Sequence, residues 1–306
     1  MDNTRHAVIT DFLDYIKNVR RYSNHTIRSY CHDLDDYYSF CNDFNSEQEF
    51  IHLDQTAIQS YLQQLSRNGL SAKTLARRLA SIKSLYKYML INNLVEVNIA
   101  RFVKTPKINR ELPHYLSLKE AKDILNLPSG NDEKALRERL ILELFYATGI
   151  RISELIHIQI NDIRLEERII HVIGKRNKER IVMIGSEAEE VLRNYLEVMS
   201  KKKIDRNHHY LFPALRSGKN GRRGTISTRT VFNIVKKYLK KVSNDEKLSP
   251  HSLRHTFATH MLDNGADLMA IKDMLGHSSL SSTQIYTHLQ PEKLKKIYKQ
   301  AHPHAK

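Results

Sequence analysis

The sequence predicts a mostly helical protein of two domains, with a small β-hairpin or sheet confined to the second. Apolar residues recur with helical spacing through 1–105, which indicates a first, all-helical domain. The segment 106–116 holds two prolines and scattered charge, as linkers do. In 117–306, only the stretch 168–184 has the β-branched character of strands. A chain of 306 residues is long enough for two such domains.

Local signals mark the helices of the first domain. Ser23 or Asn24 is placed to cap a long amphipathic helix, and Gly69 is placed to end a later one. A further helix is expected over 71–90, because apolar residues follow one another there at helical spacing. Its predicted core face consists of Leu75, Leu79, Ile82, Leu85, Tyr86 and Met89.

The second domain begins with a capping box formed by Ser117 and Glu120. A buried-looking helix over 136–148 ends at Gly149, and another helix begins near Arg151. The hairpin described above follows. The remaining elements are a helix over 186–199, a basic glycine-rich loop over 216–229, and helices that continue toward the end of the chain.

Positive charge is unevenly distributed along the chain. The net charge is +15, yet 1–54 carries 10 acidic against 5 basic residues, whereas 55–105 carries 8 basic against 1 acidic. Lys73, Arg77 and Arg78 belong to the basic part and lie off the apolar stripe of their helix. Segregated positive charge favours a nucleic acid, so these side chains are expected to contact phosphates; the alternative is a solvated charged face. Two basic domains joined by a flexible linker would close around a DNA duplex as a C-shaped clamp.

Several classes of protein are excluded. The chain lacks a run of eighteen apolar residues and an N-terminal signal pattern, so it is expected in the cytoplasm, without membrane contact. Its two cysteines, Cys31 and Cys41, form no CxxC motif, which argues against a disulfide scaffold or a zinc site. Phosphate-binding glycine loops and compact carboxylate clusters are also missing, and no cofactor or catalytic metal is expected.

Basic side chains gather at the start of the helix expected over 249–262. Ser249 is a suitable N-cap and Pro250 suits the first helical position. His251 and Arg254, three residues apart, share one face at the positive end of the helix dipole. This arrangement is unfavourable unless an anion such as a phosphate completes it. The alternative is a structural histidine and an arginine paired with a carboxylate elsewhere.

Three other stretches contain candidate residues for the same site. Arg151 follows the helix-ending glycine, Lys175 lies in the hairpin turn 24 residues later, and His277 precedes Tyr286 by nine residues. Taken alone, each of these residues more often has a structural role than a catalytic one. In this order, and with the His-x-x-Arg motif between them, they resemble the tyrosine recombinase (phage integrase-like) family, most closely its Xer-type members. The segment 23–37 is similar to the opening motif of that family's helical, SAM-like core DNA-binding domain.

The resemblance implies transfer of a DNA phosphodiester onto a tyrosine by the second domain, an α+β catalytic domain with chemistry like that of type IB topoisomerases. Tyr286 would attack the phosphate, form a 3′-phosphotyrosyl intermediate and release a 5′-hydroxyl. His251 is the candidate base for the tyrosine proton. Lys175 is the candidate acid for the leaving oxygen.

The same resemblance assigns the positive charge of the site. Arg151 and Arg254 would hold the non-bridging oxygens with their planar forks of donors, and His277 would donate another hydrogen bond. Glu154, one turn after Arg151, would orient the arginines. Neither metal nor ATP is required in this scheme, because guanidinium and imidazole groups supply the charge and the phosphotyrosyl ester conserves the bond energy.

The hairpin turn departs from the family pattern at one position. The family often has a second glycine after Gly174-Lys175, where this chain has Arg176. Arginine resists positive φ, so the turn available to Lys175 changes. Arg176 and Lys178 are expected to contact DNA.

The end of the chain suggests assembly. A helix over 292–301 places Leu294, Ile297 and Tyr298 on one face. The resemblance implies that this helix docks on a neighbouring protomer in a DNA-bound tetramer; the alternative is packing on its own domain. The tetramer would contain one recombinase or two related ones, and a DNA translocase is a further candidate partner, as activator.

Three functions remain open. The first is a recombinase that resolves chromosome dimers at a terminus site during cell division, favoured by the compact chain. The second is an integrase or invertase of a mobile element with the same chemistry. The third is a DNA-binding regulator that has lost catalysis, which the complete set of motif residues disfavours.

Overall fold

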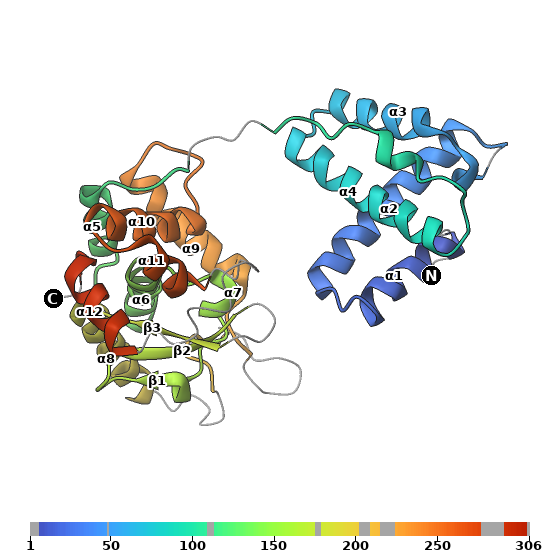
Figure 1. The fold of residues 1–306 in the computed structure, drawn as a ribbon. Helices are drawn as coiled ribbons and strands as arrows, with labels where there is room; N and C mark the ends of the chain where they lie inside the picture. Colours follow the sequence, from blue (N-terminus) through green and yellow to red (C-terminus); the bar gives the residue numbers. More distant parts are fainter. Residues whose placement is uncertain are drawn as a thin grey trace. The chain divides into compact units, whose positions relative to one another are not determined.

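The computed structural model describes residues 6–47, 49–108, 113–174, 179–201, 209–214, 224–276 and 291–304 (Figure 1). The chain divides into two compact units, Met1–Glu111 (unit 1) and Leu112–Lys306 (unit 2). Both are mostly helical, and one small antiparallel sheet lies in unit 2. The predicted fold class is therefore confirmed.

Unit 1 is built from α-helices joined by short segments. Its elements are α1 (Ala7–Asn18), α2 (Asn24–Phe44), the 3-10 helix η1 (Phe50–His52), α3 (Gln55–Arg67), α4 (Ala72–Ile91) and the 3-10 helix η2 (Ile99–Phe102). Side-chain oxygens of Ser23, Asp54 and Ser71 accept hydrogen bonds from backbone amides at the helix starts. All six residues predicted for the core face of α4 are buried. Local periodicity and capping thus suffice to define this unit's helices.

Unit 2 packs helices around one small sheet. Its helices are α5 (Leu118–Asn126), α6 (Glu133–Thr148), α7 (Ile152–Leu155), η3 (Ile160–Asp162), α8 (Ser186–Lys201), α9 (Thr228–Val242), α10 (Pro250–Asp263), α11 (Leu268–Leu275) and α12 (Pro291–Ala301). The sheet has the order β1 (Ile163–Arg164), β2 (Ile169–Ile173), β3 (Glu179–Met183). Within the hairpin, Ile170 pairs with Val182, and both face the core. The hairpin of β2 and β3 was predicted. Strand β1 was not, because a strand of two residues is too short to show the alternation of apolar and polar residues.

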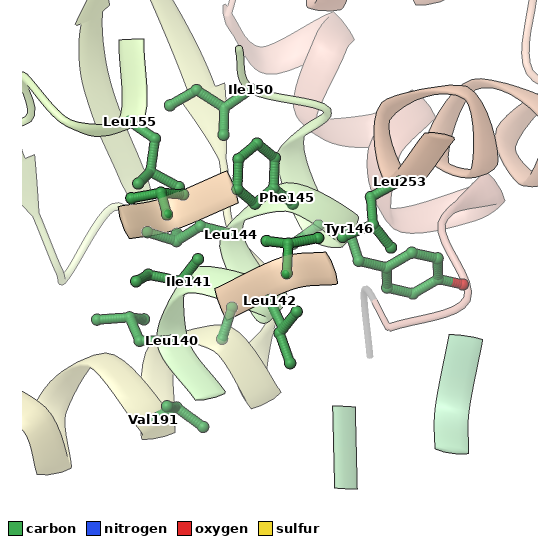
Figure 2. Close-up of a cluster of buried hydrophobic side chains, with 14 of the residues drawn as sticks. Leu140, Ile141, Leu142, Leu144, Phe145, Tyr146, Ile150, Leu155, Val191 and Leu253 are labelled. Carbon is green, nitrogen blue, oxygen red and sulfur yellow. The ribbon is translucent and has the colours of Figure 1, made fainter. Parts of the chain in front are cut away.

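Helix α6 is the centre of unit 2. It is buried on every side from Leu140 to Thr148, and Figure 2 shows its side chains pointing in several directions into the surrounding core. Helices α5, α8, α9 and α10 all pack against it. A helix surrounded in this way has no solvent-facing side, which explains why apolar residues occupy nearly all positions from Leu140 to Ala147, with Glu143 as a buried exception. It ends, as predicted, at Gly149, which adopts a left-handed conformation with φ 57°.

Helix α12 packs on its own unit in this single chain. It contacts α10, α11 and β3, and only 3% of the Tyr298 surface is exposed. Packing of α12 on its own unit is the alternative that the sequence left open. Docking of this helix on a neighbouring protomer stays a prediction. At the other end of the unit, Leu116 is fully buried in the core, although it was assigned to the linker.

Two classes of protein were excluded from the sequence, a disulfide scaffold and a membrane protein, and the cysteines and helices of the structure are relevant to both. Cys31 and Cys41 both lie on α2, and neither forms a disulfide. Burial raises the pKa of Cys41 to about 12, so its thiol stays protonated at neutral pH. None of the helices in the described ranges is both long and apolar enough to span a membrane.

Candidate active site

Three arginines converge on the C-terminal end of α11. Each donates to one of three consecutive backbone carbonyls there: Arg180 Nε to Met274 (3.1 Å), Arg254 Nη2 to Leu275 (2.5 Å) and Arg151 Nη2 to Gly276 (3.1 Å). The last carbonyls of a helix lack helical partners and carry partial negative charge. The end of α11 therefore holds three guanidinium groups, from β3, α10 and the start of α7, in one place.

Glycines at two helix ends make this approach possible. Gly149 ends α6 and Gly276 ends α11, both with positive φ. A Cβ atom on Gly149 would lie 2.6 Å from Leu275 Cδ2 and 2.7 Å from Phe257 Cδ1. The turn after α6 thus packs directly against α10 and α11, which brings Arg151 to the end of α11.

One carboxylate lies among the three arginines. Glu154 Oε2 accepts from the backbone amide of Arg151 (2.9 Å), while its Oε1 accepts from Arg151 Nη1 (2.8 Å) and Arg180 Nη1 (2.6 Å). The Glu154 side chain is 2% exposed. Burial alone would raise the pKa of this carboxyl, but the hydrogen bond and charge of Arg180, together with Arg151, hold it below its usual value. The predicted orienting role of Glu154 is consistent with these contacts and stays a prediction.

Sequence reasoning missed Arg180. Its side chain is 12% exposed, and alternation along β3 places it on the same face as the buried Val182. A charged residue on the core face of a strand requires partners inside the protein, which here are Glu154 and the Met274 carbonyl. The available signal was therefore the position of Arg180 within the strand pattern.

Arg254 is the most buried of the three arginines, at 8% exposure. Its Nη1 donates to the carbonyl of Gly149, in addition to the Nη2 bond with Leu275. Burial, followed by the charges of Arg151 and Arg180, lowers its pKa to about 10, so the group remains charged at neutral pH. Three guanidinium groups against one carboxylate leave a net positive charge that favours an anion.

His251 lies on the same helix as Arg254. Helix α10 begins as predicted, with Ser249 as N-cap and Pro250 at the first position, and the Ser249 amide donates to Ser252 Oγ (3.1 Å). His251 is exposed, three residues before the buried Arg254. The structure thus brings Arg151, Glu154 and Arg254 together, with His251 at the exposed start of α10.

The other predicted site residues of unit 2 lie outside the described residues. These are the catalytic candidates Lys175, His277 and Tyr286, and the candidates for DNA contact Arg176 and Lys178. Gly174 and Gly276, the last described residues before each stretch, are adjacent in sequence to Lys175 and His277.

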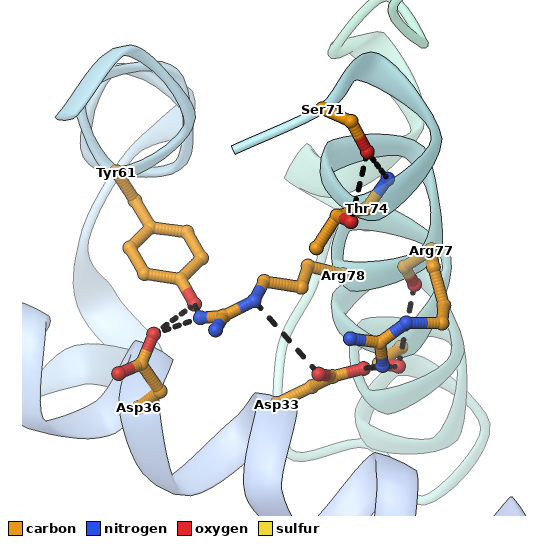
Figure 3. Close-up of polar contacts among 8 residues, drawn as sticks. Asp33, Asp36, Tyr61, Ser71, Thr74, Arg77 and Arg78 are labelled. Atoms are coloured by element: carbon orange, nitrogen blue, oxygen red, sulfur yellow. Dashed lines mark hydrogen bonds and ion pairs between the residues drawn. The ribbon is translucent and has the colours of Figure 1, made fainter. Parts of the chain in front are cut away.

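The three basic residues predicted to contact phosphates in unit 1 differ in their surroundings, and Figure 3 shows two of them, Arg77 and Arg78. Lys73 is exposed, and Arg77 is half-exposed while it forms an ion pair with Asp33. The expectation that Arg78 lies off the buried face is wrong. It is 9% exposed, forms an ion pair with Asp36, and donates to the hydroxyl of Tyr61 (2.7 Å). Acidic partners on α2, distant in sequence, hold Arg78 in the interior; its contact with phosphate stays a prediction.

Replacing Glu154 with glutamine should destabilise unit 2 by about 3 kcal/mol at pH 7, because the partly buried guanidinium groups of Arg151 and Arg180 lose their buried carboxylate. Since folding lowers the pKa of Glu154, its contribution is complete above the unfolded value near ~4.3 and disappears as the pH falls through the folded value. Urea unfolding of both proteins should therefore show a difference at pH 7 that shrinks in acid. Glu190→Gln, at an exposed position on α8, is the control. Equal stability of Glu154→Gln and the parent at pH 7 would contradict this account.

Comparison with known proteins identifies the family. The model of the phage integrase family matches residues 114–293, and that of the phage integrase N-terminal SAM-like domain matches residues 9–92. The chain belongs to the phage integrase family. The family predicted from the sequence motifs is therefore confirmed.

Curated relatives cover the whole chain. The tyrosine recombinase XerC of Thermodesulfovibrio yellowstonii is 39% identical, over 100% of this chain and 99% of the relative. The tyrosine recombinase XerD of Halalkalibacterium halodurans is 37% identical, over 97% and 98%. This phage integrase family member is therefore a tyrosine recombinase, an enzyme of site-specific recombination.

Solved structures show the same fold at lower identity. The Tn1549 transposon integrase, in complex with transposon right end DNA, has a TM-score of 0.69 at 17% identity, over 95% of this chain and 98% of that one. The XerH site-specific recombinase bound to a palindromic difH substrate has a TM-score of 0.67 at 22% identity, over 95% and 84%. The phage integrase fold thus extends over both units of this chain.

Proposed function

We propose that this tyrosine recombinase cleaves and rejoins DNA through a 3′-phosphotyrosyl intermediate formed on Tyr286. The supporting observation is the arginine cluster, in which the Glu154 carboxylate pairs with Arg151 and Arg180, while Arg254 donates to backbone carbonyls and senses the charge of Glu154. A guanidinium group has five N–H donors, and the contacts of Arg151 and Arg254 leave several of these for a ligand. A phosphodiester is the anion that matches this excess of planar donors.

The proposed reaction exchanges one phosphodiester for another. The Tyr286 oxygen bonds to phosphorus as the bond to the 5′-oxygen breaks, while His251 accepts the phenol proton and Lys175 protonates the leaving oxygen. Negative charge accumulates on the non-bridging oxygens, where Arg151 and Arg254 stabilise it together with His277. Because Arg254 is already fixed by two backbone carbonyls, it needs little reorganisation to do so. Rejoining is the reverse of this step.

Both units are proposed to contact the duplex. The XerH structure contains a recombination site, and this relative shares the fold over 95% of the present chain. In unit 1, Lys73 and Arg77 are the exposed candidates for phosphate contacts. In unit 2, Arg176 and Lys178 are proposed to add contacts from the hairpin turn. The excess of positive charge in each unit supports contacts of both with duplex DNA.

Chromosome dimer resolution at a terminus site is the proposed biological role. The XerC and XerD names of relatives that match the full chain support it over integration of a mobile element. A tetramer of one or two recombinases, activated by a DNA translocase, is the corresponding assembly. A mobile-element role predicts efficient cleavage of an element's end sequence and little cleavage of the terminus site.

Replacing Tyr286 with phenylalanine should abolish covalent DNA capture and leave DNA affinity within a few-fold, because only the attacking oxygen is lost. The measurement is denaturing electrophoresis of the protein with nicked DNA that carries the host terminus site, beside a band-shift assay. Tyr115→Phe, at an exposed tyrosine of unit 2, should capture DNA like the parent. Persistent covalent capture by Tyr286→Phe would refute the proposed nucleophile, and loss of capture without loss of binding excludes an inert regulator.

A further inference from the structure

A second cluster of ionisable groups lies in unit 2, apart from the residues of the arginine cluster. Glu143 comes from α6, Glu187 from the first turn of α8, and His304 from the segment after α12. His304 Nδ1 lies 3.0 Å from Glu187 Oε2 and 3.9 Å from Glu143 Oε2. One donor atom of each residue lies within 4.8 Å of the other two. Three distant parts of the chain thus present two carboxylates and one imidazole to a single point.

Two atoms of this cluster are buried without hydrogen bonds. The Glu143 side chain is 1% exposed and the His304 side chain 9% exposed. Within the described ranges, neither Glu143 Oε2 nor His304 Nδ1 makes a hydrogen bond of good geometry; His304 Nδ1 has only its ion-pair contacts with the two carboxylates. A buried carboxylate oxygen without a hydrogen bond is costly, and a cation bound between these atoms would offset that cost.

The neighbouring histidines are already satisfied. His302 Nε2 donates to the carbonyl of Tyr146 (3.2 Å), and its Nδ1 accepts from the His304 amide (3.1 Å). His260 Nδ1 is paired with the hydroxyl of Tyr146 (3.1 Å), while its Nε2 donates to the Leu116 carbonyl (3.0 Å). These contacts fix the chain around His304 and leave its Nδ1 as the ring nitrogen that faces the carboxylates.

The donor set and its spacing match a transition-metal ion. Metal–ligand bonds of ~2.0–2.1 Å in a tetrahedral zinc site place the ligand atoms about 3.3 Å apart, between the two distances observed here. An imidazole nitrogen with two carboxylates suits zinc, whereas calcium and magnesium prefer oxygen donors alone. Glu187 is 55% exposed, which gives an ion access from solvent.

We propose that Glu143, Glu187 and His304 form a binding site for a divalent transition-metal ion of the zinc type, which fastens the end of the chain to α6 and α8. The site takes no part in the proposed strand transfer, which needs no metal. The alternative for the same geometry is a protonated His304 that pairs with both carboxylates, and the experiment below separates the two.

The test uses the full chain after treatment with a chelator. Zinc is titrated by calorimetry, and cobalt is titrated as a spectroscopic probe of the coordination geometry. His304→Ala and Glu187→Gln each remove one donor, and Glu143→Gln removes the buried one. Glu190→Gln, an exposed glutamate one turn along α8, is the matched control.

We expect one tightly bound zinc ion per chain in the parent and in the control. Loss of an outer partner of a metal ligand typically weakens binding ~10–100-fold, so loss of a ligand should weaken it at least that much in His304→Ala and Glu187→Gln. Zinc should also raise the Tm of the parent and not of these variants. The chain has 16 histidines, so the difference between parent and variants is the decisive quantity.

Equal zinc binding by the parent and by His304→Ala would overturn the proposal, as would the absence of binding to the parent. Either result assigns the cluster to a metal-free contact between imidazolium and carboxylates. If Glu143→Gln fails to fold, His304→Ala and Glu187→Gln still decide the outcome.

Discussion

Replacing Arg254 with lysine should lower the rate of DNA strand cleavage by on the order of 100- to 1,000-fold, the usual effect of removing one donor to a transition state. The guanidinium of Arg254 bridges the carbonyls of Gly149 and Leu275 and has further N–H groups for a phosphate. A single ammonium group cannot span both carbonyls and also hold a non-bridging oxygen. The cleavage rate is measured with nicked DNA, and the affinity by band shift.

DNA affinity of Arg254→Lys should stay within a few-fold of the parent, because the positive charge is kept. Arg193→Lys is a suitable control, since Arg193 lies on the surface of α8 in a pair with Glu189. It should cleave at the parent rate. An unchanged cleavage rate in Arg254→Lys would show that the planar fork of Arg254 is not used in the reaction.

Replacing Gly149 with alanine should destabilise unit 2 by about 3 kcal/mol. The left-handed backbone at φ 57° is unfavourable for alanine by ~1–2 kcal/mol. The new Cβ would also lie 2.6 Å from Leu275 Cδ2 and 2.7 Å from Phe257 Cδ1, and overpacking of this kind costs about 1–3 kcal/mol. Thermal unfolding should show a Tm lowered by roughly 10 °C.

Gly265 provides the matched control for this substitution. It also has positive φ, at 83°, but no atom lies within 4 Å of the Cβ it would gain. Gly265→Ala should therefore lose only the stability that the left-handed backbone costs, without the loss from overpacking. Equal losses in the two variants would contradict a close approach of the Gly149 turn to α10 and α11.

Features that depend on neighbouring residues in sequence were predictable. The buried stripe of α4, the end of α6 at Gly149, and the start of α10 at Ser249 and Pro250 all follow from spacing and capping. The catalytic motif was also recognisable from its order and spacing, and the family it indicated is confirmed.

Features that depend on tertiary contacts were not predictable. Arg78 is buried because Asp36 and Tyr61, on other helices, surround it, and no pattern around residue 78 announces these partners. The position of Arg180 on the core face of its strand was visible in the strand pattern, but its partners, Glu154 and Met274, lie 26 and 94 residues away and were not predictable. The hydrogen bonds of three arginines to consecutive carbonyls at the end of α11 were not predictable either, because they form only when the helices and strands of unit 2 pack together.

The central claim is that the arginine cluster stabilises a DNA phosphate under attack by Tyr286. Its most direct test is mass spectrometry of the covalent adduct formed by the full chain with nicked DNA, after digestion of both protein and DNA. We predict one adduct, in which Tyr286 is joined to a 3′-phosphate and the other DNA end carries a 5′-hydroxyl. An adduct through another residue, or one joined to a 5′-phosphate, would contradict the claim.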